Sequence, residues 1–178
     1  INNMQGNGVM IERSTNCGII ASTLYANQGA DIIMTCKPFL NRFEWMKEGY
    51  SRNFAQNNFI YNTSESAEAA RIWLEWQVGN IISHNFISHP MKYGIRSSNC
   101  LENVIEFNEI CGGPNLVNDM GQIYCDAKNA YYITIRNNYL HDASIEYVNM
   151  QPGVYLDTTA SWYFVYNNII YNQPRGVF

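Results

Sequence analysis

The sequence predicts an all-β protein folded as a right-handed parallel β-helix, and three observations support this prediction. Aromatic residues make up 14% of the 178-residue chain, with 13 Tyr, and Asn is abundant, whereas charged residues reach only 15%. Aromatic and β-branched residues favour strands and Asn favours turns. Amphipathic helical periodicity is almost absent. A segment centred on one Asn also recurs every 20 to 30 residues, as expected for the coils of a solenoid.

Each copy of the repeat places an Asn between two short apolar stretches. Five copies are clear, and in a weaker copy, "IIASTLYAN", Thr23 takes the Asn position. Alternating apolar residues on both sides predict two short strands. The Asn is expected at the bend between them, because Asn tolerates the left-handed backbone region. Stacked bends would form a ladder of side-chain amides at the strand spacing of ~4.8 Å. The repeat therefore predicts one coil per copy, centred on Asn58, Asn85, Asn108, Asn138 and Asn168.

A β-sandwich built from hairpins is the alternative β architecture. It would need turn signals every ~8–12 residues and two-residue loops of the Asn-Gly type, and the sequence has neither. We expect residues 1–178 to form a single β-helix domain. Both ends of the sequence resemble coil interior rather than caps, so we expect this domain to be a fragment or a central part of a longer β-helix.

Composition and charge argue against several classes of partner. The formal net charge is −4 and the 11 basic residues form no cluster, which argues against nucleic acid. No apolar run approaches the ~20 residues that cross a bilayer, so we expect no membrane contact. The five cysteines show no C-x-x-C or metal-finger spacing, which favours small buried side chains and no metal site.

Acids recur after the same apolar pattern in successive coils. "GVMIE" ends on Glu12, "RIWLE" on Glu75, "QIYCD" on Asp126 and "GVYLD" on Asp157, and Ser98 takes the position in between. In register, Asp126 and Asp157 would be neighbours roughly 5 Å apart, the separation of the two carboxyls in a retaining glycosidase. The alternative is that the position simply faces solvent at a strand end. Nearby rings would bind sugar together with Glu75, and the candidates are Trp73, Trp76, Tyr124 and Tyr155.

Two further candidates lie outside that column. Asp119 follows a Gly-Gly-Pro turn and precedes a strand, in "VNDMGQIY", where it is either a site residue or an ordinary turn cap. His141 in "NNYLHD" is a candidate for substrate binding. A pairing with Asp142 is not expected, because adjacent residues of a strand face opposite sides.

The C-terminal part of the chain resembles a known group of enzymes. "VNDMGQIYC…ITIRNNYLHD…GVYLDTTAS…VYNNIIYN", roughly residues 103–172, is similar to the right-handed parallel β-helix glycoside hydrolases, in the branch with α-L-fucosidases, xylanases and β-xylosidases. The resemblance implies that Asp119 and Asp157 act as nucleophile and general acid/base. The chain departs from that pattern at Thr158, where an acid is usual, and at 159–160, where Thr-Ala replaces Gly-Ser.

Three functional hypotheses follow. The first is a glycoside hydrolase that uses two carboxylates and no cofactor. The second is a polysaccharide lyase or epimerase, which removes a proton beside a uronate carboxylate with cationic help from Lys92 or Arg96 beside Glu75, and with Ca²⁺ as a possible cofactor. The third is a glycan-binding or structural β-solenoid without catalysis. We expect a carbohydrate substrate as the partner, and a secreted, cell-surface or periplasmic protein.

Overall fold

The computed structural model describes residues 1–36, 52–61, 70–113, 120–126, 130–143, 151–158 and 160–178. Their strands form three parallel sheets. The first sheet contains β1 (Val9–Glu12), β4 (Ile32–Thr35), β7 (Ala70–Glu75), β10 (Tyr93–Ser98), β13 (Gly121–Asp126), β16 (Pro152–Asp157) and β19 (Arg175–Val177). The second contains β2 (Gly18–Ile20), β5 (Phe54–Gln56), β8 (Ile81–Ser83), β11 (Val104–Glu106), β14 (Ile133–Arg136) and β17 (Tyr163–Tyr166). The third contains β3 (Thr23–Tyr25), β6 (Phe59–Tyr61), β9 (Phe86–Ser88), β12 (Glu109–Cys111), β15 (Tyr139–His141) and β18 (Ile169–Tyr171).

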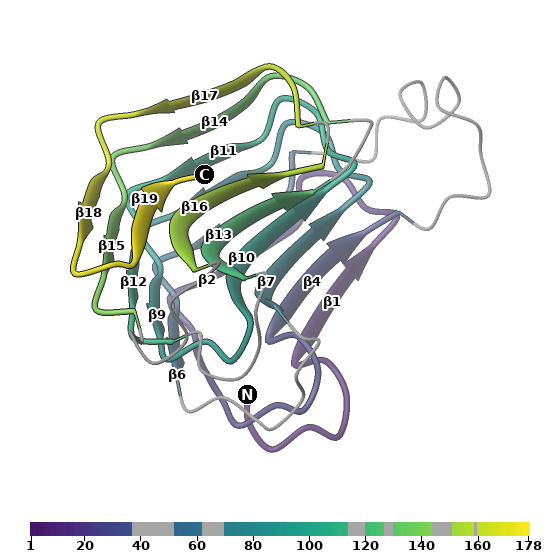
Figure 1. Cartoon of the computed structure of the whole chain (residues 1–178). Coiled ribbons are helices and arrows are strands. Elements are labelled where there is room, and N and C mark those ends of the chain that lie inside the picture. The colour runs from purple at the N-terminus through teal and green to yellow at the C-terminus, as the bar shows by residue number, and fades with distance from the viewer. Residues whose placement is uncertain (37–51, 62–69, 114–119, 127–129, 144–150, 159) are drawn as a thin grey trace.

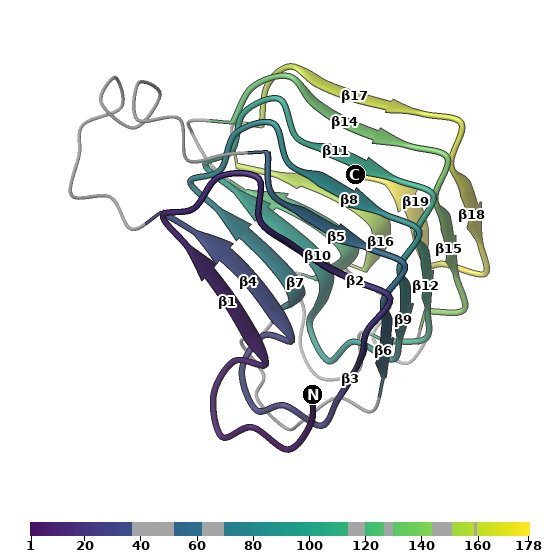
Figure 2. The ribbon, with the colours of Figure 1, turned by 180° about the vertical axis from the view of Figure 1, so that it is seen from behind.

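Every third strand along the chain pairs in the same sheet, so each coil contributes one strand to each of three faces. The strand order β1-β4-β7-β10-β13-β16-β19 follows the chain without inversion, and the other two sheets follow the same rule. Figures 1 and 2 show the coils stacked from the N-terminal to the C-terminal end. The prediction of an all-β parallel solenoid is confirmed, and no helix among the described residues is long and apolar enough to cross a membrane.

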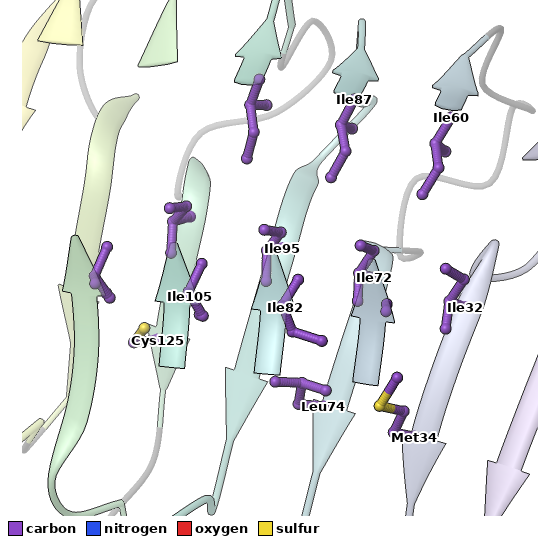
Figure 3. Packing of buried hydrophobic residues seen from close by; sticks show 14 of the residues in the cluster. Ile32, Met34, Ile60, Ile72, Leu74, Ile82, Ile87, Ile95, Ile105 and Cys125 are labelled. Atoms are coloured by element: carbon purple, nitrogen blue, oxygen red, sulfur yellow. The ribbon is translucent and has the colours of Figure 1, made fainter. Parts of the chain in front are cut away.

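The core runs along the inside of the coils as rows of aliphatic side chains. Ile82 of β8, Ile105 of β11 and Ile95 of β10 are fully buried and belong to one continuous cluster. Figure 3 shows these side chains gathered between the strands that carry them. Burying an isoleucine of this kind contributes roughly 1.5–3 kcal/mol, so the repeated alternation is a main source of stability.

The cysteines follow the prediction only in part. Cys36, Cys100 and Cys125 are buried and all five thiols are free, but Cys17 is exposed and Cys111 is half-buried. Cys17 precedes a short strand at a corner, and Cys111 ends a strand on the outer surface of the third sheet, so neither position reaches the core.

The predicted Asn ladder lies at the corner between the second and third sheets. The side-chain oxygen of Asn108 accepts hydrogen bonds from the backbone N and from Nδ2 of Asn85, at 3.0 and 2.9 Å. Asn108 bonds in the same way to Asn138, at 3.0 Å for both donors. The first coil differs by one residue from the prediction. Ser22, not Thr23, takes the ladder position, because its backbone N donates to Oδ1 of Asn58.

The prediction of left-handed backbone at the ladder asparagines is wrong. The ladder asparagines do not have positive φ; the residue before each of them does, with φ of 55° at Asn57, 57° at His84 and 54° at Phe107. The doubled Asn of "RNNY" and "YNNI" therefore has two separate roles. The first Asn tolerates the left-handed region, and the second forms the ladder.

A second, shorter ladder lies between the first and second sheets, and the sequence analysis missed it. The backbone N of Asn53 donates to Oδ1 of Asn80 at 2.7 Å, and that of Asn80 donates to Oδ1 of Asn103 at 2.8 Å. These three asparagines are buried. In the coils that contain Asn53, Asn80 and Asn103, amides thus fix two corners.

Candidate functional site

The predicted acids form one row on the outer face of the first sheet. Strand pairing places Ser98 beside Glu75 on one side and beside Asp126 on the other, and Asp126 beside Asp157. The predicted order is therefore confirmed at these positions. The structure adds one coil to the predicted order, because β4 carries Thr35 between Glu12 and Glu75. We call these positions the acid row: Glu12, Thr35, Glu75, Ser98, Asp126 and Asp157.

A second row runs parallel to the acid row, two residues earlier on each strand. Trp73, Arg96, Tyr124 and Tyr155 are register neighbours on β7, β10, β13 and β16, and we call them the aromatic row. Because side chains alternate between faces along a strand, positions two residues apart share a face. Tyr93 adds a ring that stacks on Tyr124, with centroids 4.4 Å apart, and Tyr124 meets Tyr155 edge-on at 5.2 Å.

Arg96 is the cation at the centre of these rings. Its guanidinium lies 4.9 Å from the ring centroid of Trp73, 5.4 Å from that of Tyr93 and 5.9 Å from that of Tyr124. It also donates to Oδ2 of Asp126 at 2.6 Å. Burial disfavours the cation, but the hydrogen bond and the charge of Asp126 outweigh it and raise the pKa of Arg96.

Both carboxylate oxygens of Asp126 accept hydrogen bonds. Oδ2 accepts the bond from Arg96, and Oδ1 accepts a bond from the Ser98 hydroxyl on the neighbouring strand. A guanidinium has donors only, so the Asp126 oxygen that it contacts acts as an acceptor. The side chains of Arg96 and Asp126 are 21% and 23% exposed, which leaves this ion pair within reach of a ligand.

Asp157 lies next to this pair and has its own donors. The phenol of Tyr124 donates to Oδ2 at 2.6 Å, and the backbone N and hydroxyl of Thr158 donate to Oδ1 at 2.7 and 2.9 Å. Burial raises the pKa of Asp157, but these hydrogen bonds outweigh it, and the net result is a pKa below the ordinary carboxyl value. Asp157 is therefore an anion at neutral pH.

The structure does not bring every predicted site residue to the two rows. Glu75 is in the acid row and accepts a bond from Thr35 at 3.4 Å. Trp76 follows it with φ of 55° and packs instead against the cluster of Cys36 and Leu101. Asp119 lies outside the described residues.

His141 is on the third sheet, not the first. Its ring stacks on Tyr139 with centroids 4.1 Å apart, and its two nitrogens lie 3.3 Å from Oε1 of Glu109 and 2.8 Å from Oδ2 of Asp142. The expectation that His141 and Asp142 would not pair is wrong. Asp142 follows the end of β15 with φ of 52°, and this turn brings its carboxylate back to the ring.

Sequence reasoning named Arg96 only under the lyase hypothesis and missed Tyr93 and the hydroxyl of Ser98 as parts of the site. The signal was present, because Arg96 precedes Ser98 by two residues and so shares its face. Among the residues that the structure describes, no group of three or more His, Cys, Asp and Glu side chains is arranged to hold a metal ion.

Comparison with known proteins adds information on the fold. No protein-family model matches the sequence, and no curated protein matches it. Among solved structures, the chain is similar to the A-module of the mannuronan C-5 epimerase AlgE4 from Azotobacter vinelandii, with a TM-score of 0.60 and 9% sequence identity. The match covers 97% of this chain and 52% of that one, so this chain spans about half the length of the A-module. The chain thus has the right-handed parallel β-helix fold, and the glycoside hydrolase branch finds no support in these comparisons.

Proposed function

We propose that the protein modifies an acidic polysaccharide by removing the proton next to a uronate carboxylate, as a lyase or an epimerase. The observation that carries the proposal is Arg96, a cation that lies near three aromatic rings and directly beside Asp126 and the Tyr124–Asp157 pair. The similarity in fold to an enzyme named as a mannuronan epimerase supports the same substrate class.

The chemistry needs three groups, and the site offers each of them. A carboxylate on the sugar must be neutralised before the adjacent C–H becomes acidic, and Arg96 can do this. Lys92 can assist, since its Nζ lies 5.2 Å from the centroid of the Tyr93 ring that Arg96 also contacts. A base must take the proton, and Asp157 is an ionised carboxylate next to Arg96 and Asp126. An acid must return a proton, and the Tyr124 phenol already donates to Asp157.

The two outcomes of this chemistry differ in where the second proton goes. Asp157 takes the C5 proton, and the electron pair is delocalised into the carboxylate held by Arg96. If the Tyr124 proton then moves to the glycosidic oxygen, that bond breaks and an unsaturated sugar forms. If a proton from solvent water instead reaches C5 on the face opposite Asp157, and Asp157 then releases its proton to the solvent, the sugar is epimerised and the chain stays intact.

Hydrolysis is the second candidate, and the adjacent positions of Asp126 and Asp157 favour it. Neighbouring strands place the Cα atoms of two such residues roughly 5 Å apart, a spacing near the carboxyl separation of a retaining pair. A retaining pair also needs one carboxyl that stays protonated until it donates to the leaving group. Asp157 has a lowered pKa, and Asp126 accepts from a guanidinium, so neither described carboxyl fits the role of the acid.

The test is incubation of the protein with polymannuronate and other polyuronates. Ultraviolet absorbance detects an unsaturated product, and NMR of the polymer detects epimerised units. Arg96→Gln and Asp157→Asn are expected to abolish either signal while the circular dichroism spectrum stays unchanged. Arg136→Gln is the matched control, because Arg136 is paired with Glu106 at 2.7 Å on the second sheet. Full activity in Arg96→Gln would overturn the proposal.

A further inference from the structure

A third arginine lies on the same sheet as Arg96 and takes no part in the proposed chemistry. Arg175 begins β19, where it is the register partner of Pro152 on β16. Its guanidinium lies 4.9 Å from the ring centroid of Phe178. It is exposed, and among the described residues no carboxylate pairs with it, in contrast to Arg71, Arg96 and Arg136.

Phe178 continues the aromatic row. Its backbone N donates to the carbonyl of Val154 at 3.0 Å, and its carbonyl accepts from the N of Leu156 at 2.8 Å. These bonds bring Phe178 next to Tyr155, and the two rings meet at 5.2 Å with planes 75° apart. The row of rings therefore passes from Tyr93 through Tyr124 and Tyr155 to Phe178 without a break.

We propose that Arg175 and Phe178 form a distal subsite that binds the carboxylate and ring of a second acidic sugar unit on the same polysaccharide chain. This inference rests on the proposed function, since it assumes an acidic polymer at Arg96. Figure 1 shows β19 directly beside β16 in the stack that also holds β13. Tyr124 on β13 and Phe178 are two strand spacings apart, roughly 10 Å.

The geometry fits a polymer that runs along the axis of the solenoid. A pyranose unit in an extended chain advances by about one strand spacing, so the unit at Phe178 is two units away from the one at Tyr124. An exposed arginine over an aromatic ring offers a planar donor pair to a carboxylate and an apolar surface to the sugar ring. The subsite would thus select chains of at least three units.

Binding of oligomannuronates of two and five units tests this inference without reference to turnover. Affinity is measured by calorimetry at low salt with the Asp157→Asn protein, alone and combined with Arg175→Gln or with Arg136→Gln. Arg175→Gln is expected to weaken binding of the five-unit chain by about fivefold and to leave the two-unit chain unchanged. Arg136→Gln removes the same charge from another face and is expected to change neither.

The outcomes separate this inference from the proposed function. Equal weakening of both chain lengths by Arg175→Gln and Arg136→Gln would show a general field effect and overturn the subsite. No change with either variant overturns it as well. If wild type turns over polyuronate while Arg175→Gln has no length-dependent effect, the subsite alone fails. If binding depends on Arg175 and on length but wild type shows no turnover, the proposed chemistry alone fails.

Discussion

Replacement of Asn108 by alanine tests whether the ladder of amides holds the coils together. Asn108 is 1% exposed. Its Nδ2 donates to the carbonyl of Ile82 at 2.9 Å and to Oδ1 of Asn138 at 3.0 Å. Its Oδ1 accepts from the backbone N and from Nδ2 of Asn85. Alanine removes all four bonds and changes nothing on the outer surface.

The magnitude follows from the groups that lose their ladder partner. The backbone N of Asn85 is left without this partner inside the coil. The carbonyl of Ile82 loses one bond but stays in the paired β8–β11 ladder, Nδ2 of Asn85 still donates to Ala55, and Oδ1 of Asn138 still accepts from the backbone. A buried polar group left unpaired costs about 1–3 kcal/mol. The unpaired donor, together with about 1 kcal/mol for the lost bond to Ile82, predicts a loss of about 2–4 kcal/mol in the free energy of unfolding.

Asn168→Ala is the matched control. Asn168 has the same ladder bonds to the preceding coil but is only half-buried, so water can replace them. We expect it to cost about 1 kcal/mol. Urea unfolding measures both variants, and hydrogen exchange measures the amide of Asn85, whose protection is expected to fall in Asn108→Ala. Equal midpoints for the two variants, with unchanged protection of that amide, would refute the reasoning.

Three further predictions follow from single contacts. Phe107 has φ of 54° and is 48% exposed, and Asn tolerates this backbone conformation better than Phe. Phe107→Asn is therefore expected to increase the free energy of unfolding by about 0.5–1 kcal/mol and to raise the melting temperature. A lower melting temperature would contradict the left-handed role of this position. Arg71 and Asp31 form an ion pair in which both side chains are 1% exposed. Arg71→Met leaves the Asp31 carboxylate buried without its partner, so the variant is expected to lose about 3–5 kcal/mol in the free energy of unfolding, measured in urea. The double variant Arg71→Met with Asp31→Asn is expected to lose clearly less than Arg71→Met alone. Tyr124→Phe is expected to raise the pKa of Asp157 in an NMR titration. Because the folded-state pKa is below the ordinary value, the stability from this carboxylate is present above about pH 4 and lost as pH falls, and the variant should lose less on acidification.

The architecture could be predicted because it follows from the local periodicity of apolar residues in the sequence. Alternation around each Asn sets which side chains enter the core, and the spacing of copies sets one coil per copy. The same periodicity predicted Asp126 beside Asp157. Bends at equivalent positions in successive coils keep the neighbouring strands of each sheet in register. The coil of β4 was missed because residues 32–35 read "IIMT", with Thr35 where an acid was sought.

The contacts of the site could not be predicted from spacing. Side-chain length and direction decide that Arg96 reaches Asp126 across one strand, and that Tyr124 reaches Asp157. Trp76 looked equivalent to Trp73, yet a positive φ at the strand end turns it toward Leu101. His141 occupies a different face of the coil, and a motif read along the chain contains no information on which face follows a bend.

Incorporation of solvent deuterium into a polyuronate is the most direct test of the proposed chemistry. The protein is incubated with polymannuronate in D₂O, and the polymer and its fragments are analysed by NMR and mass spectrometry. Removal of the C5 proton predicts either deuterium at C5 of intact chains or unsaturated sugars that have lost the C5 hydrogen, both absent in Arg96→Gln. New reducing ends without either change would identify hydrolysis, and an unchanged polymer that still binds would identify a glycan-binding solenoid. Either result would contradict the proposal.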